Sequence, residues 1–60
     1  MKVQVFTATK EFIFDKIDVV NVGPNKELEL SVGGILKAEF APGEWKSWIR
    51  DHDENVEVYV

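Results

Sequence analysis

Apolar and polar residues alternate along most of this chain, which is the pattern of a β-strand with one buried face. Valine, isoleucine, phenylalanine and tryptophan recur at every second position, and glycine, proline and asparagine fall between these runs. The pattern predicts an all-β fold of about five to six short strands. We expect the strands over residues 2–6, 11–14, 18–22, 28–32, 36–40 and 56–60.

The turns between these runs predict antiparallel hairpins and their registers. A turn at 7–10, a Gly-Pro-Asn-Lys-Glu loop at 23–27 and a glycine pair at 33–34 each reverse the chain. The glycine pair is expected to belong to a three-residue loop that includes Ile35. The expected facing pairs are Val3 with Phe14, Val5 with Phe12, Val20 with Leu30, Val22 with Leu28, Val32 with Leu36, Leu30 with Ala38 and Leu28 with Phe40.

The segment after residue 40 allows two structures. Residues 41–44 read Ala-Pro-Gly-Glu, which suits a type II turn because proline stands second and glycine third. The competing structure is a short helical turn over 44–50, since Trp45, Trp48 and Ile49 also have helical spacing. We favour the hairpin. Its expected facing pairs are Phe40 with Trp45, Ala38 with Ser47 and Leu36 with Ile49.

A meander of tight hairpins would curl into a small antiparallel barrel or roll of SH3-like size, because curling removes exposed sheet edges. Residues 1–60 make one small β domain, whose core is near the lower size limit for independent folding. The residues expected to face the core are Val3, Val5, Phe12, Phe14, Val20, Val22, Leu28, Leu30, Leu36, Ala38, Phe40, Trp45, Ile49, Val56, Val58 and Val60. The opposite faces carry Phe6, Ile13, Val19, Ile35, Trp48 and Tyr59.

The charge of the chain argues against nucleic acids and membranes as partners. Eleven acidic residues outnumber seven basic ones, and the formal net charge is −4. The cations are spread singly, so no basic stripe can follow a phosphate backbone. The longest uncharged runs, such as residues 30–36, are too short to cross a bilayer, and the first residues alternate like a strand. We expect a soluble, cytoplasmic protein.

The residue types that carry most catalytic and metal chemistry are scarce. There is no cysteine, and His52 is the only histidine, which excludes a cysteine nucleophile and a multi-histidine zinc site. Ser31 and Ser47 lie in other segments than His52, which argues against a catalytic triad. The acids around His52 lack EF-hand spacing, and Gly33-Gly34 lacks the Gly-Lys-Ser/Thr of a phosphate-binding loop. We expect no enzyme activity, no metal and no cofactor.

The apolar residues left on the outer faces indicate a protein partner, since Trp and Tyr are enriched at interface centres. We therefore expect a non-catalytic interaction or structural module. The partner is another protein or a second copy of the chain, and we favour a homo-oligomer. The expected partner-binding residues are Phe6, Ile13, Trp48 and Tyr59, with edge pairing by the strand at 56–60 as another route. The alternative is that these side chains are covered within the chain.

Acids near the end of the sequence suggest a second class of function. Asp51, Asp53, Glu54 and Glu57 form an acidic patch with no cation among them. Such a patch could mimic phosphates, so the chain would act as an acidic inhibitor or nucleic-acid mimic on a basic partner protein. A net charge of −4 is also ordinary for solubility.

Overall fold

The computed structural model of the chain describes residues 1–52 and 55–59, and it places the side chains of residues 1–50. The described residues form β-strands and no helix, so none of their segments is a helix that could span a membrane. The strands are β1 (Lys2–Phe6), β2 (Glu11–Phe14), β3 (Val19–Val22), β4 (Leu28–Val32), β5 (Ile35–Phe40), β6 (Ser47–His52) and β7 (Asn55–Tyr59). The prediction of an all-β fold is confirmed.

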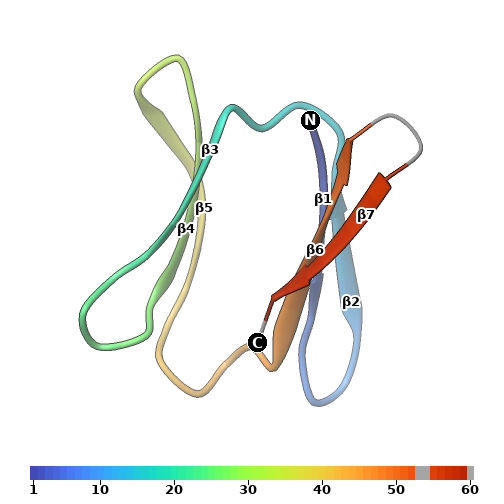
Figure 1. The fold of residues 1–60 in the computed structure, drawn as a ribbon. Coiled ribbons are helices and arrows are strands. Elements are labelled where there is room, and N and C mark those ends of the chain that lie inside the picture. Colours follow the sequence, from blue (N-terminus) through green and yellow to red (C-terminus); the bar gives the residue numbers. More distant parts are fainter. Residues whose placement is uncertain (53–54, 60) are drawn as a thin grey trace.

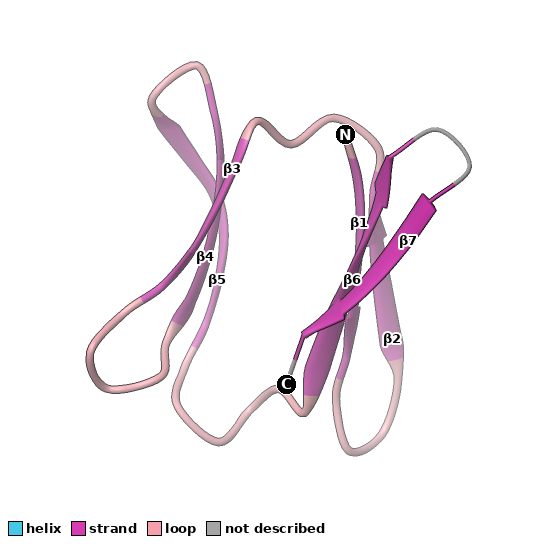
Figure 2. Ribbon diagram, in the orientation of Figure 1, coloured by secondary structure: helices cyan, strands magenta, loops and turns pink. Residues whose placement is uncertain are grey.

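The strands form two antiparallel sheets that lie as two facing layers (Figure 1, Figure 2). One sheet has the order β2-β1-β6-β7, and the other has the order β3-β4-β5. The chain passes between the layers after β2 and again after β5. Neither sheet closes on itself within the described residues, so the expected barrel or roll is not confirmed. The described residues form an open sandwich of two sheets, with the core between them.

Two hairpins form in the predicted register. The observed pairs are Val3 with Phe14, Val5 with Phe12, Val20 with Leu30 and Val22 with Leu28. In the loop before β4, Lys26 has a φ of 69°, and its N–H donates to the carbonyl of Gly23 at 3.0 Å. The geometry of this turn sets the register of the β3–β4 hairpin. The register matters because a slip of one residue would turn every side chain of the strand to the other face.

The β4–β5 hairpin departs from the predicted register near its turn. Gly33 and Gly34 have φ values of 57° and 79°. Two successive left-handed residues are typical of a two-residue type I′ turn, which matches the twist of the flanking strands. Val32 therefore faces Ile35, and the predicted pairing of Val32 with Leu36 is wrong.

A β-bulge restores the predicted register farther from the turn. Leu30 faces Ala38 as predicted, but the next pair is Ser31 with Leu36, so Lys37 lies between two consecutive pairs. Since Leu30 points inward with 0% exposure, its neighbour Ser31 and the facing Leu36 lie on the outer face. Leu36 is 52% exposed, and its predicted place in the core is wrong.

The segment after β5 forms neither the predicted hairpin with β5 nor the alternative helical turn. The expected turn over 41–44 is present, because the Glu44 N–H donates to the Ala41 carbonyl at 2.9 Å and Gly43 has a φ of 84°. After this turn the chain crosses to the other sheet, where β6 pairs with β1. This pairing gives the central strand β1 a partner on both of its edges, which a β5–β6 hairpin would not.

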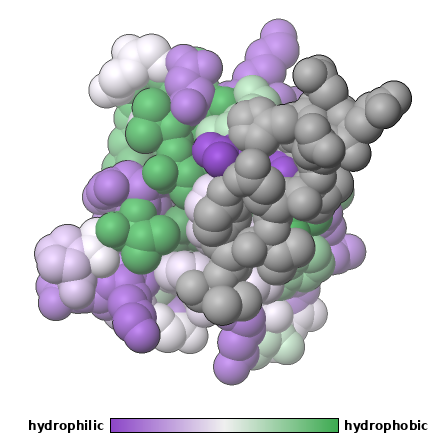
Figure 3. Space-filling model, in the orientation of Figure 1, coloured by the Kyte–Doolittle hydropathy of each residue, from purple (hydrophilic) through white to green (hydrophobic). Residues whose placement is uncertain are grey.

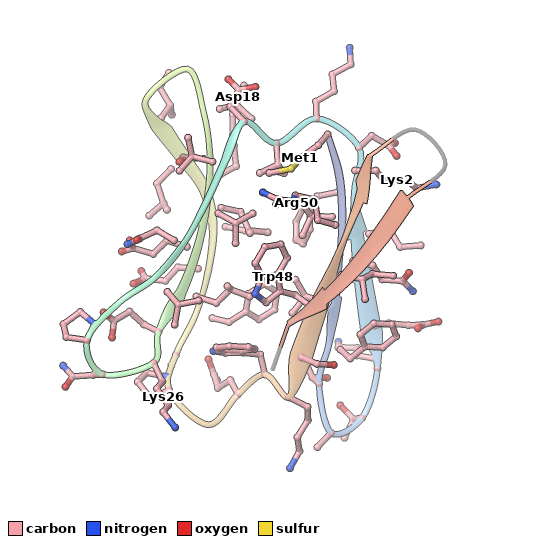
Figure 4. The ribbon with its side chains drawn as sticks, in the orientation of Figure 1. Met1, Lys2, Asp18, Lys26, Trp48 and Arg50 are labelled. Atoms are coloured by element: carbon pink, nitrogen blue, oxygen red, sulfur yellow. The ribbon has the colours of Figure 1, made fainter. Side chains whose placement is uncertain are left out.

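Pairing with β1 decides which side chains of β6 face the core. Trp48 faces Val5 and Arg50 faces Val3, and both valines are fully buried. Trp48 is only 6% exposed, and Figure 4 shows Trp48 and Arg50 pointing into the space between the sheets. The predicted place of Trp48 on the outer face is therefore wrong. Ile49, which was predicted to face inward, has the opposite orientation.

The core draws on both sheets and on the segment that joins them. Its buried residues are Val3, Val5, Ile17, Leu28, Leu30 and Trp48. Ile17 lies in the connection before β3 and was not predicted as a core residue. Its carbonyl accepts the Met1 amino group at 2.9 Å, and its N–H donates to the Met1 carbonyl at 3.0 Å. This double contact holds the connection against the start of β1.

Aromatic rings join the sheets on the β2 and β5 side. The Phe40 ring centroid lies 5.3 Å from that of Phe12 and 6.3 Å from that of Phe14, both with edge-to-face geometry. Such contacts add about 0.5–1.5 kcal/mol to the stabilisation from buried area. The β3 strand therefore borders the opposite side of the sandwich from this aromatic cluster.

Candidate interaction surface

Exposed apolar side chains concentrate on the three-stranded sheet. The described residues include five large apolar side chains that are exposed: Ile13, Val19, Val22, Ile35 and Leu36. Their exposed fractions run from 46% to 62%, and all but Ile13 belong to β3 or β5. Figure 3 shows hydrophobic side chains gathered on this side of the molecule, over β3. Apolar groups gathered in this way usually mark a contact surface.

Three of these residues gather at the end of the sheet beside the glycine turn. Val19 faces Ser31, and Ser31 faces Leu36, so the small Ser31 side chain lies between two apolar ones. Val19 and Leu36 are two strand spacings apart, which is about 10 Å. Ile35 directly precedes Leu36 at the start of β5. The carboxylate of Asp18 accepts the Gly33 N–H at 2.9 Å, which ties the turn to the start of β3. We refer to Val19, Ile35 and Leu36 as the apolar end of the sheet.

The outer face of this sheet, which carries Val19 and Leu36 at one end, is acidic at the other end, whereas Ile35 pairs with Val32 and lies on the inner face. Glu29 faces Glu39, and the side-chain amide of Asn21 donates to Glu29 at 3.1 Å. Like charges directly opposite each other destabilise a sheet, so this pair works against the fold. Glu27 and Glu44 join the pair around a hollow of about 540 Å³. We refer to these four glutamates as the acidic end. The predicted register already sets Glu29 opposite Glu39, but it does not bring the loop residues Glu27 and Glu44 beside them.

The edge strands differ in how well they are protected from further pairing. The sheet edges are β2 and β7 in one sheet and β3 and β5 in the other. Charges and bulges on an edge strand discourage pairing with another chain. β2 contains Glu11, β7 contains Glu57, and β5 contains Lys37, Glu39 and the bulge. Of the seven strands described, only β3 has no charged residue.

The predicted partner-binding residues do not form one patch. Phe6 is half-buried at the end of β1, and Ile13 is 58% exposed on β2, the neighbouring strand of the same sheet. Trp48 lies in the core, so it cannot act as a surface anchor. Tyr59 faces Trp48 in the register of β6 and β7, and its side chain is outside the described part of the structure.

The predicted acidic patch also lies largely outside the described part of the structure. Asp53 and Glu54 belong to the residues that are not described, and the side chains of Asp51 and Glu57 are not described either. The described carboxylates that do come together are those of the acidic end. No three His, Asp or Glu side chains meet as metal ligands within the described residues.

A second hollow, of about 410 Å³, lies between the turn at 7–10 and the turn before β6. Phe12 and Phe40 line it, and the Lys10 ammonium lies 5.2 Å from the centroid of the Phe12 ring. Glu44 is also on its wall, where the carboxylate accepts the Ala41 N–H at 2.9 Å and so holds the turn. The hollow offers apolar contact and one cation at its rim.

Comparisons with protein-family models, with curated proteins and with solved structures find no match for this chain.

Proposed function

We propose that this chain is a non-catalytic protein-interaction module that self-associates through its three-stranded sheet. The observation that carries the proposal is the edge strand β3 of this sheet, which has no charged residue and carries two exposed valines, Val19 and Val22. Association would cover the apolar side chains and pair the backbone groups along the edge. The sheet replaces the expected aromatic patch as the contact, because Trp48 belongs to the core.

The size of the chain gives association a physical reason. A sixty-residue domain has an expected unfolding free energy of about 3–9 kcal/mol, at roughly 0.05–0.15 kcal/mol per residue. Covering a half-exposed valine, leucine or isoleucine contributes about 1 kcal/mol, since complete burial contributes about 1.5–3 kcal/mol. A contact over a few of these side chains would raise the unfolding free energy by a substantial fraction of its value.

Sedimentation equilibrium from micromolar to millimolar concentration tests this proposal. We expect the average mass to rise from that of the 6.9 kDa chain toward twice that value. The rise should steepen with salt, because screening weakens the repulsion between two copies of net charge −4. A mass of one chain at every concentration and salt would contradict self-association.

The acidic end favours a second candidate function, an acidic module that binds a basic partner protein. Ionic contacts of this kind weaken as salt rises, whereas apolar association does not. Retention on immobilised polylysine can be compared for Glu39→Lys and Asp15→Lys, which change the net charge equally. Lower retention of Glu39→Lys would support a local acidic site, and equal retention would count against it.

A further inference from the structure

The open edge of β3 presents the backbone groups of two valines. Hydrogen-bonded and non-hydrogen-bonded pairs alternate along an antiparallel ladder. The Gly23 N–H donates to the Glu27 carbonyl at 2.8 Å, which makes these two residues a bonded pair in line with the β3–β4 register. Alternation from this pair directs the N–H and C=O groups of Val20 and Val22 away from β4, toward the open edge.

We propose that two copies of the chain pair edge to edge along β3, antiparallel and about a two-fold axis, to form one six-stranded sheet. This inference rests on the proposed function and specifies its contact. The absence of charge on β3 makes a second copy of the chain a suitable partner for this strand. Two molecules of net charge −4 can approach along an uncharged edge, whereas stacking their outer faces would bring the acidic ends together.

The positions of the open backbone groups select one register. When Val20 of one copy faces Val22 of the other, each of these valines both donates and accepts a hydrogen bond across the edge, and Asn21 faces its own copy on the axis. If Val20 faced its own copy instead, Val22 would face Asp18, whose N–H already donates to the Ser31 carbonyl at 2.9 Å. The first register therefore satisfies all the open groups of the two valines.

The same register suits the side chains. Val20 packs against the core and Val22 is 46% exposed beside it, and both share the inner face with Leu28 and Leu30. Placing Val22 against the partner's Val20 continues the apolar inner face across the axis. The outer faces of the two copies are continuous as well, because the paired residues Val20 and Val22 lie on the same face of the strand.

A unique thiol at the axis tests the register directly. The chain has no cysteine, so Asn21→Cys introduces a single one at an exposed position. Two such residues facing each other in a non-hydrogen-bonded pair have Cα atoms about 4.5 Å apart, within the range for a disulfide. We expect Asn21→Cys to form a covalent dimer under mild oxidation, and the matched variant Ile13→Cys, on β2 of the other sheet, to stay reduced.

A charge at the edge tests the contact without a covalent bond. Val22→Lys places an ammonium in the proposed apolar contact, and we expect it to weaken self-association by about tenfold or more in sedimentation equilibrium. The matched variant Ile13→Lys carries the same charge on β2 of the other sheet, where the side chain is 58% exposed, and should associate like the wild type. Circular dichroism of each variant checks that the fold is kept.

The outcomes separate the two levels of the proposal. A wild-type chain that stays monomeric at every concentration refutes the proposed function and this contact with it. A wild-type dimer that survives Val22→Lys unchanged, or that leaves Asn21→Cys uncrosslinked, refutes pairing along β3 while self-association stands. Crosslinking of Ile13→Cys in preference to Asn21→Cys would place the contact on β2 instead.

Discussion

Replacing Trp48 by alanine should remove much of the stability of the fold. Trp48 is 6% exposed and lies between the sheets, in register with Val5 and beside the rest of the core. Tryptophan-to-alanine changes in such sites cost about 3–5 kcal/mol, because the lost burial is accompanied by a cavity. The total unfolding free energy expected for a chain of sixty residues is about 3–9 kcal/mol. We therefore expect Trp48→Ala to be marginally folded or unfolded at 25 °C.

Urea titration followed by far-ultraviolet circular dichroism measures this loss at one fixed protein concentration, since self-association adds to apparent stability. Ile13→Ala is the matched control, because Ile13 is 58% exposed and its truncation should change the unfolding free energy by about 0.5 kcal/mol or less. A loss below about 1 kcal/mol for Trp48→Ala would refute the register of β6 against β1, because Trp48 would then not be a core residue.

Two further substitutions test the three-stranded sheet. Glu39→Lys should raise the unfolding free energy by about 0.2–1 kcal/mol, because it replaces a like-charge pair with Glu29 by an opposite-charge pair; thermal unfolding beside Asp15→Lys, with the same change of net charge, isolates that effect. Equal melting temperatures for the two variants would argue against a direct Glu29–Glu39 pair. Gly33→Ala should cost about 1–2 kcal/mol in urea titration because Gly33 has a φ of 57°, whereas Gly33→Asn should cost less because asparagine tolerates that angle. A larger loss for asparagine than for alanine would contradict the two-residue turn.

Local signals in the sequence predicted the hairpins closed by specific turn residues. The Gly-Pro-Asn-Lys-Glu loop and the turn at 7–10 fix a register within a few residues, and both registers agree with the structure. At Gly33-Gly34 the turn was placed correctly, but its length was wrong by one residue. A bulge between the Leu30–Ala38 and Ser31–Leu36 pairs compensates for that residue, and the alternation of Leu36 to Phe40 does not indicate it.

Pairing between distant strands could not be predicted in this way. β6 pairs with β1, which is more than forty residues earlier in the chain, and the sequence between them carries no signal for that contact. The choice of partner reverses the faces of Trp48 and Ile49, so it also changed the candidate site from an aromatic patch to a sheet edge. In the acidic end, the predicted β4–β5 register already sets Glu29 opposite Glu39, and only the loop residues Glu27 and Glu44 could not be placed from the sequence.

Amide hydrogen exchange, measured residue by residue by NMR at low and high protein concentration, tests self-association along β3 most directly. The amides of Val20 and Val22 point to the open edge, so we predict fast exchange at micromolar concentration and exchange about tenfold slower or more at millimolar concentration. The Asn21 amide, which points toward β4, should be protected to a similar degree at both. Unchanged exchange of Val20 and Val22 across this range would contradict pairing along β3.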